Sequence, residues 1–96
     1  MKIDFNTNGG NLNISLDGRL DTVTAPELES FLKEKLNEVS TLNIDCAHLA
    51  YVSSAGLRVL LATEKKMKGK MKLTNVCEVV MEVFEMTGFA DILVIE

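Results

Sequence analysis

Two adjacent serines, Ser53 and Ser54, are the residues of this chain whose type and position could support chemistry. They follow the apolar stretch Leu49–Val52 and precede a run in which leucines recur at helical spacing. A serine at a helix start lies among amide N–H groups that have no partner within the helix, at the positive end of the helix dipole. It can accept one of those N–H bonds as an N-cap, and a phosphate on its hydroxyl would be stabilised there. The pair therefore predicts an N-cap or a phosphorylation site.

Catalytic use of these hydroxyls has little support from their neighbours. The nucleophile elbow of α/β-hydrolases requires Gly-x-Ser-x-Gly, and Val52 occupies the place of the first glycine when Ser54 is the serine. A small enzyme that uses Ser54 with His48 stays open as a less favoured alternative. No second histidine is present for a metal site. We therefore predict no catalytic residue, no metal and no cofactor.

The elements that must position Ser54 alternate along the chain. Apolar residues alternate in the segments read as strands and recur every three or four residues in those read as helices. Helices between the later strands imply parallel, right-handed crossovers, whereas the first two strands should form an antiparallel hairpin. We expect an α/β fold of one domain over residues 1–96, a mixed sheet packed by helices in the order β-β-α-β-α-β-α-β. The predicted strands are residues 2–6, 11–17, 41–45, 71–75 and 92–95, and the predicted helices are residues 25–38, 54–68 and 78–87.

Local signals predict three boundaries near the serines. Thr24 is the expected N-cap of the first helix, in a capping box with Glu27. Gly18 is expected to end the second strand, and residues 46–53 are expected to form a loop that leads to Ser54.

Apolar spacing also predicts which side chains form the core. In the helix after the serines, Leu60 should face the sheet and Arg58 the solvent. In the last helix, Val79 and Phe84 should face inward, and Met86 should fill the core.

Composition narrows the possible partners and the compartment. The chain has 96 residues, 47% hydrophobic and 25% charged, which is ordinary for one globular unit. A formal net charge of −4 argues against direct binding of nucleic acid. No apolar run approaches the roughly 20 residues of a membrane helix, so no membrane insertion is expected. Cys46 and Cys77 are interpreted as reduced thiols in a cytoplasmic protein.

Three stretches resemble a known family. Ser53-Ser54-Ala55-Gly56-Leu57 resembles the signature of the anti-sigma factor antagonists, small bacterial proteins of the STAS domain family. Gly18–Leu28 and Phe84–Phe89 resemble two further recurrent stretches of that family, in the same order. In this chain Ser53 replaces the aspartate that usually precedes the family's phosphorylated serine. The family often carries a further helix after the last strand, which residues up to Glu96 do not include.

The resemblance implies a binding module rather than an enzyme. The implied partner is an anti-sigma factor with serine kinase activity, which the unphosphorylated domain sequesters so that a sigma factor is released for transcription. Phosphorylation of Ser54 would end the interaction, and a phosphatase would restore it. An alternative with the same fold is a STAS docking or scaffold domain in which Ser54 is not phosphorylated. The residues expected to face the partner are Asp21, Thr22, Ser53, Ser54, Ala55, Gly56 and Arg58.

Overall fold

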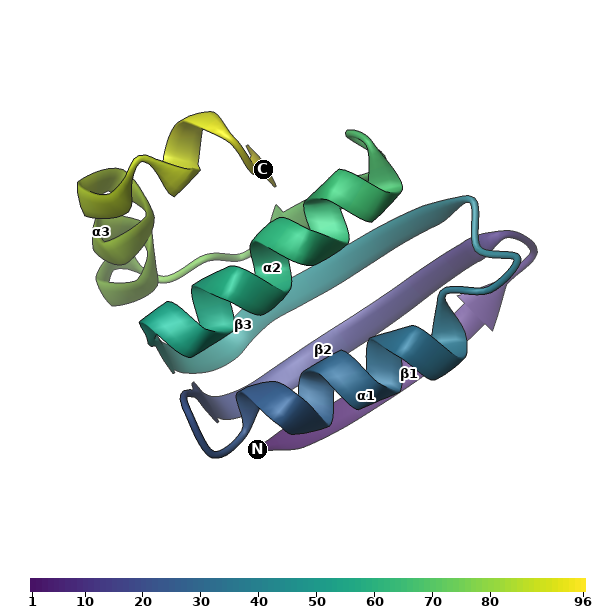
Figure 1. The fold of residues 1–96 in the computed structure, drawn as a ribbon, viewed down its shortest axis with the longest axis horizontal. Helices are drawn as coiled ribbons and strands as arrows, with labels where there is room; N and C mark the ends of the chain where they lie inside the picture. Colours follow the sequence, from purple (N-terminus) through teal and green to yellow (C-terminus); the bar gives the residue numbers. More distant parts are fainter.

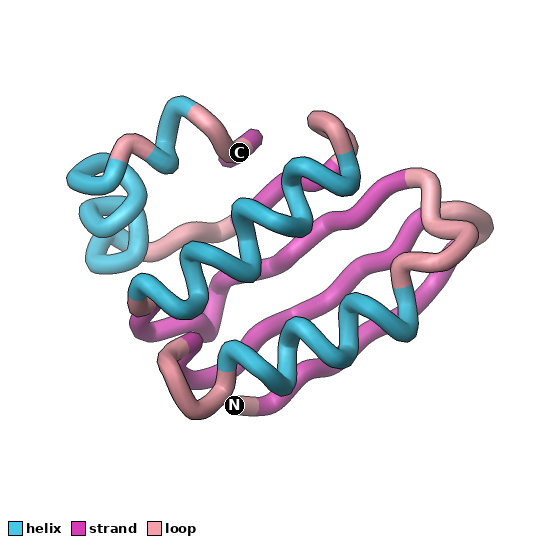
Figure 2. Tube along the Cα trace, in the orientation of Figure 1, coloured by secondary structure: helices cyan, strands magenta, loops and turns pink.

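A computed structural model describes all residues of the chain, 1–96, as a sheet with helices packed against it (Figure 1). The strands follow the order β1-β2-β3-β4-β5 in one sheet. Figure 2 shows α1 and α2 lying side by side over one face of the sheet, with α3 at the end where α2 begins. The elements are β1 (Lys2–Asn8), β2 (Asn11–Leu20), α1 (Ala25–Lys35), β3 (Thr41–Val52), α2 (Ser54–Met67), β4 (Met71–Thr74), α3 (Glu78–Thr87), the 3-10 helix η1 (Phe89–Asp91) and β5 (Val94–Ile95).

Strand pairing confirms the predicted topology. β1 and β2 form an antiparallel hairpin, and β2, β3, β4 and β5 pair in parallel. Each parallel step crosses over through a helix, because a parallel strand must start again at the same end of the sheet. The carboxyl ends of β2 and β3 therefore lie together, and the segments that follow them meet at one end of the sheet.

Residues 46–53, which were expected to form a loop, instead continue β3 as far as Val52. From Ser15 to Asp17, β2 advances two residues while the paired segment of β3 advances three, from Asp45 to His48. β3 contains a second extra residue between Leu49 and Tyr51, which pair with the adjacent residues Gly18 and Arg19 of β2. These are β-bulges, which break strict alternation without ending a strand. The prediction failed because a bulged strand loses the two-residue period.

Gly18 does not end β2, which continues to Leu20. The glycine has φ +117° and lies at the second bulge, where a residue without a Cβ adopts this backbone most readily. β2 thereby reaches as far as β3, and Leu20 pairs with Val52. This extension brings the turn after β2 up to the serines.

Other boundaries differ from the predictions by a few residues. α1 ends at Lys35, with Leu36 as its C-cap, rather than near residue 38. The last strand is limited to Val94–Ile95, because the preceding residues form η1 and its exit.

The core lies between the inner face of the sheet and the helices. Leu60 is 1% exposed, as predicted, and Phe84 of α3 is fully buried. Two predictions for α3 are wrong: Val79 is 55% exposed and Met86 is 87% exposed. α3 contacts the end of the sheet along a narrow stripe, so apolar residues beside that stripe remain in solvent. The other fully buried large side chains are Leu12, Ile14, Leu16, Leu20, Leu28, Leu42, Ile44, Leu49, Met71 and Leu73.

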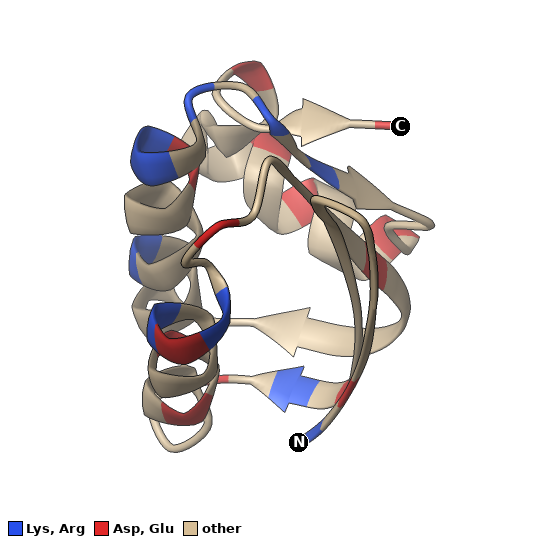
Figure 3. Cartoon of the chain, turned by 90° about the vertical axis from the view of Figure 1, so that its right-hand side faces the viewer, with Lys and Arg blue, Asp and Glu red and all other residues tan.

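Charged residues lie mainly on the helices and at the ends of the strands (Figure 3). Lys and Arg form bands along α1 and α2, on the side of the molecule away from the sheet. None of the helices combines the length and hydropathy that crossing a membrane would require.

Candidate functional site

The candidate site lies at the end of the sheet where β2 and β3 finish together. The Ser53 N–H donates to the Leu20 carbonyl oxygen at 2.8 Å. This bond ties the first residue after β3 to the last residue of β2. The turn that follows Leu20 and the start of α2 are therefore held side by side.

Ser53, and not Ser54, is the N-cap of α2. Its backbone is extended, and its Oγ accepts a long hydrogen bond from the Gly56 N–H at 3.5 Å. Its carbonyl oxygen accepts the Leu57 N–H at 2.9 Å, which begins the helical hydrogen bonds. Ser54 is the first helical residue, and its exposed hydroxyl forms no hydrogen bond within the chain. The cap is thus formed without Ser54, whose hydroxyl is available for modification.

Gly56 allows α2 to begin this close to β2. It is buried, and a Cβ built on it would lie 2.7 Å from Leu20 Cγ and 3.0 Å from the Leu20 carbonyl oxygen. A methyl group at this position would displace the backbone or the side chain of Leu20. We therefore expect Gly56 to position the site by packing rather than to touch a partner.

Asp21 organises the turn between β2 and α1. Its Oδ1 accepts the N–H groups of Val23 at 3.0 Å and Thr24 at 3.1 Å, an Asx-type turn. The pKa of Asp21 lies below its ordinary value, and the hydrogen bond from the Thr24 N–H is the largest cause. Hydrogen bonds of this kind favour the charged carboxylate. Asp21 therefore presents a fixed negative charge at the site.

The predicted capping box of α1 is absent. Thr24 is the N-cap by position but makes no side-chain cap bond. Its Oγ1 donates to the Arg19 carbonyl oxygen at 2.6 Å and accepts the Asp21 N–H at 2.9 Å. The Thr24 side chain therefore points back to the end of β2 and closes the turn instead of capping the helix.

Arg19 is held in place by two neighbours. Its Nε lies 3.9 Å from Asp21 Oδ2, and its guanidinium lies 4.3 Å from the centroid of the Tyr51 ring. A guanidinium over an aromatic face is attracted by the ring quadrupole. Arg19 thus has two attractive neighbours within the chain, although its side chain is 62% exposed.

A shallow groove separates the first turns of α1 and α2. It has a volume of about 190 Å³, and Thr22, Glu29, Ala55 and Arg58 contribute to its lining. Arg58 is exposed and forms no ion pair or hydrogen bond within the chain. Of the residues predicted to face a partner, Thr22, Ala55 and Arg58 thus share one groove, while Asp21, Ser53 and Ser54 lie at the same end of the sheet.

Sequence reasoning did not identify every residue that shapes this surface. Val23 is 78% exposed in the turn that Asp21 organises. An apolar residue between polar turn residues is the feature of the sequence that could have indicated its exposure. Pro26 also lines the groove, although a proline in the first turn of a helix indicates by itself only a helix start. The stacking of Arg19 on Tyr51 had no signal in the sequence, because the bulges of β3 decide which residues of β2 and β3 are neighbours.

The structure does not place His48 in contact with Ser54. His48 lies within β3, exposed and paired with Asp17 of β2. The segment from His48 to the end of β3 at Val52 runs beside three residue steps of β2, from Asp17 to Leu20, which span about 10 Å. No hydrogen bond joins His48 to Ser54, so His48 is not placed to act as the base of a serine nucleophile.

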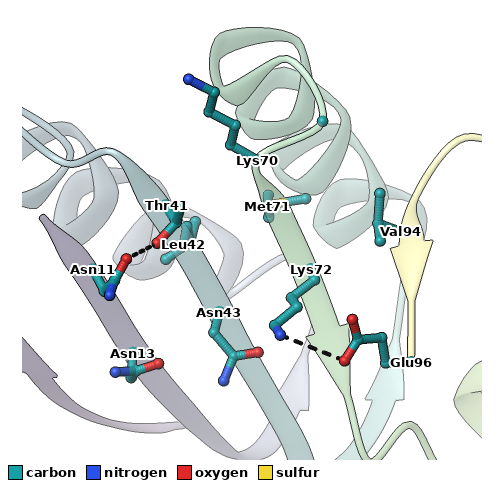
Figure 4. A pocket seen from close by; sticks show the side chains of 11 residues that line it. Asn11, Asn13, Thr41, Leu42, Asn43, Lys70, Met71, Lys72, Val94 and Glu96 are labelled. Carbon is teal, nitrogen blue, oxygen red and sulfur yellow. Dashed lines mark hydrogen bonds and ion pairs between the residues drawn. The ribbon is translucent and has the colours of Figure 1, made fainter.

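A larger hollow lies on the sheet at the amino ends of β3 and β4, away from Ser54 (Figure 4). Its volume is about 580 Å³, and three of the 11 residues that line it are hydrophobic. Lys72 and Glu96 form an ion pair across it at 3.4 Å, and Asn43 Oδ1 is buried without a partner. These groups offer hydrogen bonds, and they include no cluster of side chains that could hold a metal ion.

Comparison with known proteins agrees with this geometry. The STAS domain model matches residues 2–96. The chain is 30% identical over 96 residues to the anti-sigma-B factor antagonist of Bacillus subtilis, covering 97% of this chain and 88% of that protein. Its fold is similar to that of the anti-sigma factor antagonist SpoIIAA in its unphosphorylated form, with a TM-score of 0.84, 18% identity and coverage of 99% of this chain and 88% of that chain. The phosphorylated form of SpoIIAA from Bacillus gives a TM-score of 0.75 with 17% identity, over 99% of this chain and 91% of that chain. Because the family model matches nearly the whole length of the chain, the chain belongs to the STAS domain family.

Proposed function

We propose that this chain is an anti-sigma factor antagonist that binds its partner through the Ser54 end of the sheet. The observation that carries the proposal is the exposed, unbonded Ser54 hydroxyl at the start of α2, in a chain whose relative from Bacillus subtilis is named an antagonist of an anti-sigma factor. Antagonism of this kind is a binding function, which suits a surface on which His48 does not contact the Ser54 hydroxyl. The protein acts in the bacterial cytoplasm and sequesters the anti-sigma factor, so that a sigma factor is released for transcription.

The interaction ends when the partner, acting as a serine kinase, phosphorylates Ser54, and a phosphatase restores it. A phosphate adds about −1.5 to −2 charge units at pH 7. A partner surface complementary to a neutral hydroxyl would then meet repulsion and a cost of desolvation. Support for such a switch comes from the occurrence of both phosphorylated and unphosphorylated forms of the structurally similar SpoIIAA.

The fold should survive this modification. Negative charge at a helix N-terminus is stabilising by about 0.3–1 kcal/mol. Because Ser53 rather than Ser54 caps α2, a phosphate on Ser54 leaves the cap bond in place. The change is therefore expected in binding and not in folding.

Calorimetry with the serine kinase that co-purifies with the parent chain from the source bacterium tests the proposal. The parent and Ser54→Ala should bind equally, whereas Ser54→Asp should bind at least about tenfold more weakly, a loss near 1.4 kcal/mol. Ser30→Asp, the same change on the exposed side of α1, should bind like the parent. Only Ser54→Ala, and not Ser53→Ala, should lose phosphate incorporation.

Two results would support the alternatives. Equal affinity of the parent, Ser54→Asp and enzymatically phosphorylated protein would favour a STAS docking or scaffold domain. Covalent labelling of Ser54 by a serine-directed fluorophosphonate would favour a small enzyme.

A further inference from the structure

Arg58 is a cation without an internal partner beside the proposed phosphorylation site. Two arginines lie at this end of the sheet, and Arg19 is already engaged with Asp21 and Tyr51. Arg58 forms no ion pair or hydrogen bond, although it lines the groove between α1 and α2. Its guanidinium therefore remains available.

Arg58 lies one helical turn after Ser54 on α2. The two residues are four apart on the helix, which places their Cβ atoms about 5–6 Å from each other on one face. Helical side chains lean towards the N-terminus of their helix, so the long side chain of Arg58, which lines the groove beside α1, is within reach of a phosphate on Ser54. An anion that precedes a cation by four residues is also the favourable order with respect to the helix dipole.

Nearby carboxylates leave Arg58 free for this contact. Glu29 lines the same groove, but its Oε1 lies 4.0 Å from Lys33 Nζ and forms no ion pair with Arg58. The Asp21 carboxylate is occupied by the N–H groups of its own turn and by Arg19. A phosphate on Ser54 would thus not displace an existing ion pair of Arg58.

We propose that Arg58 clamps the phosphate on Ser54 through paired N–H···O bonds. A guanidinium presents a planar fork of donors that matches two phosphate oxygens, and such bonds are stronger than those between neutral groups. The clamp rests on the proposed phosphorylation and adds a second effect to it. Modification places negative charge on the partner-facing surface and also withdraws the cation of Arg58 from that surface.

Phosphorus NMR of the isolated, phosphorylated chain tests the clamp. Phosphoserine is installed at position 54 during translation by genetic-code expansion, so no kinase or partner is needed. The second pKa of phosphoserine is ordinarily about 6, and a clamping guanidinium lowers it by favouring the dianion. Arg58→Ala should raise this pKa by about 0.3 units or more relative to the parent. Arg58→Lys should recover only part of the difference, because an ammonium lacks the fork.

A matched control separates the clamp from general charge effects. Lys65→Ala removes one positive charge from the same side of α2, about 16 Å from Ser54 along the helix, and should leave the pKa unchanged. An equal pKa in the parent and Arg58→Ala, or an equal shift in Lys65→Ala, would overturn the clamp. So would full recovery in Arg58→Lys. Because the phosphate is installed without a kinase, these outcomes are distinct from a failure of Ser54 to be phosphorylated in the cell or to control binding.

Discussion

At the scale of single residues, the two serines differ in what their side chains can do. The Ser53 hydroxyl is directed to the Gly56 N–H, whereas the Ser54 hydroxyl forms no hydrogen bond. One residue of displacement along the chain separates a hydroxyl bonded within the helix start from an exposed, unbonded one, because only the N-cap position directs its side chain back to the unpaired amides. Asp21 and Arg58 differ in the same way. The Asp21 carboxylate accepts hydrogen bonds from its own turn, whereas the Arg58 guanidinium forms no bond within the chain.

Gly56→Ala tests the close approach of α2 to β2. Helix propensity alone would make this change stabilising by about 0.5–1 kcal/mol. The added Cβ would lie 2.7 Å from Leu20 Cγ, and this overlap opposes the gain in helix propensity. We expect overpacking to prevail, with a loss of about 1–3 kcal/mol in the free energy of unfolding measured in urea. Ser54→Ala, two residues away and exposed, should stay within about 0.5 kcal/mol of the parent. A Gly56→Ala variant as stable as the parent would contradict the close packing.

At the scale of elements, β3 determines where α2 begins. Its two bulges lengthen the strand without changing the face on which Leu49 and Val52 are buried. They let β3 and β2 finish together, so that the Ser53 N–H reaches the Leu20 carbonyl oxygen. The site is therefore built on the ends of rigid strands rather than on a loose loop, an arrangement that preserves its geometry.

The packing of α2 on the sheet can be measured at two of its residues. Leu60 is 1% exposed, so Leu60→Ala should cost about 2–5 kcal/mol through lost burial and a residual cavity. Lys65 is exposed on the same helix, and Lys65→Ala should change stability by less than about 0.5 kcal/mol. Urea melts in which Lys65→Ala was the more damaging change would show that the buried face of α2 is assigned incorrectly.

At the scale of the whole molecule, one core spans the sheet and the helices and decides the reactivity of the cysteines. Cys46 is fully buried, and burial raises the pKa of its thiol to about 12. Cys77 is half-buried before α3, and its Sγ donates to the Leu49 carbonyl oxygen at 3.4 Å. Because a thiolate is the reactive species, Cys46 is unreactive while the core is closed.

Titration with a thiol-specific reagent such as Ellman's reagent can verify this difference. In native protein at neutral pH, Cys77 should react first and Cys46 only on the timescale of unfolding, whereas both should react at once in denaturant. Cys77→Ala should remove the fast reaction and leave the slow one. A fast reaction that persists in Cys77→Ala would mean that Cys46 is accessible in the folded state.

Much of the fold could be predicted from local patterns. The order of strands and helices, the N-terminal hairpin and the parallel crossovers follow from apolar periodicity and turn residues, and the structure confirms them. Predictions failed where tertiary contacts prevail over local preference. Thr24 matched a capping box but bonds to the end of β2, and Val79 matched an inward stripe but lies beyond the narrow contact of α3.

The sequence by itself determined the class of fold, the start of a helix at the serines and the exposure of Arg58, since spacing and residue type act locally. Only the tertiary structure decided that β2 and β3 finish together beside the serines. It also decided that Asp21 and Arg19 are engaged while Arg58 is free. The physical reason is that hydrogen bonds and ion pairs between residues distant along the chain depend on strand register, and here the register depends on bulges that leave no periodic mark in the sequence.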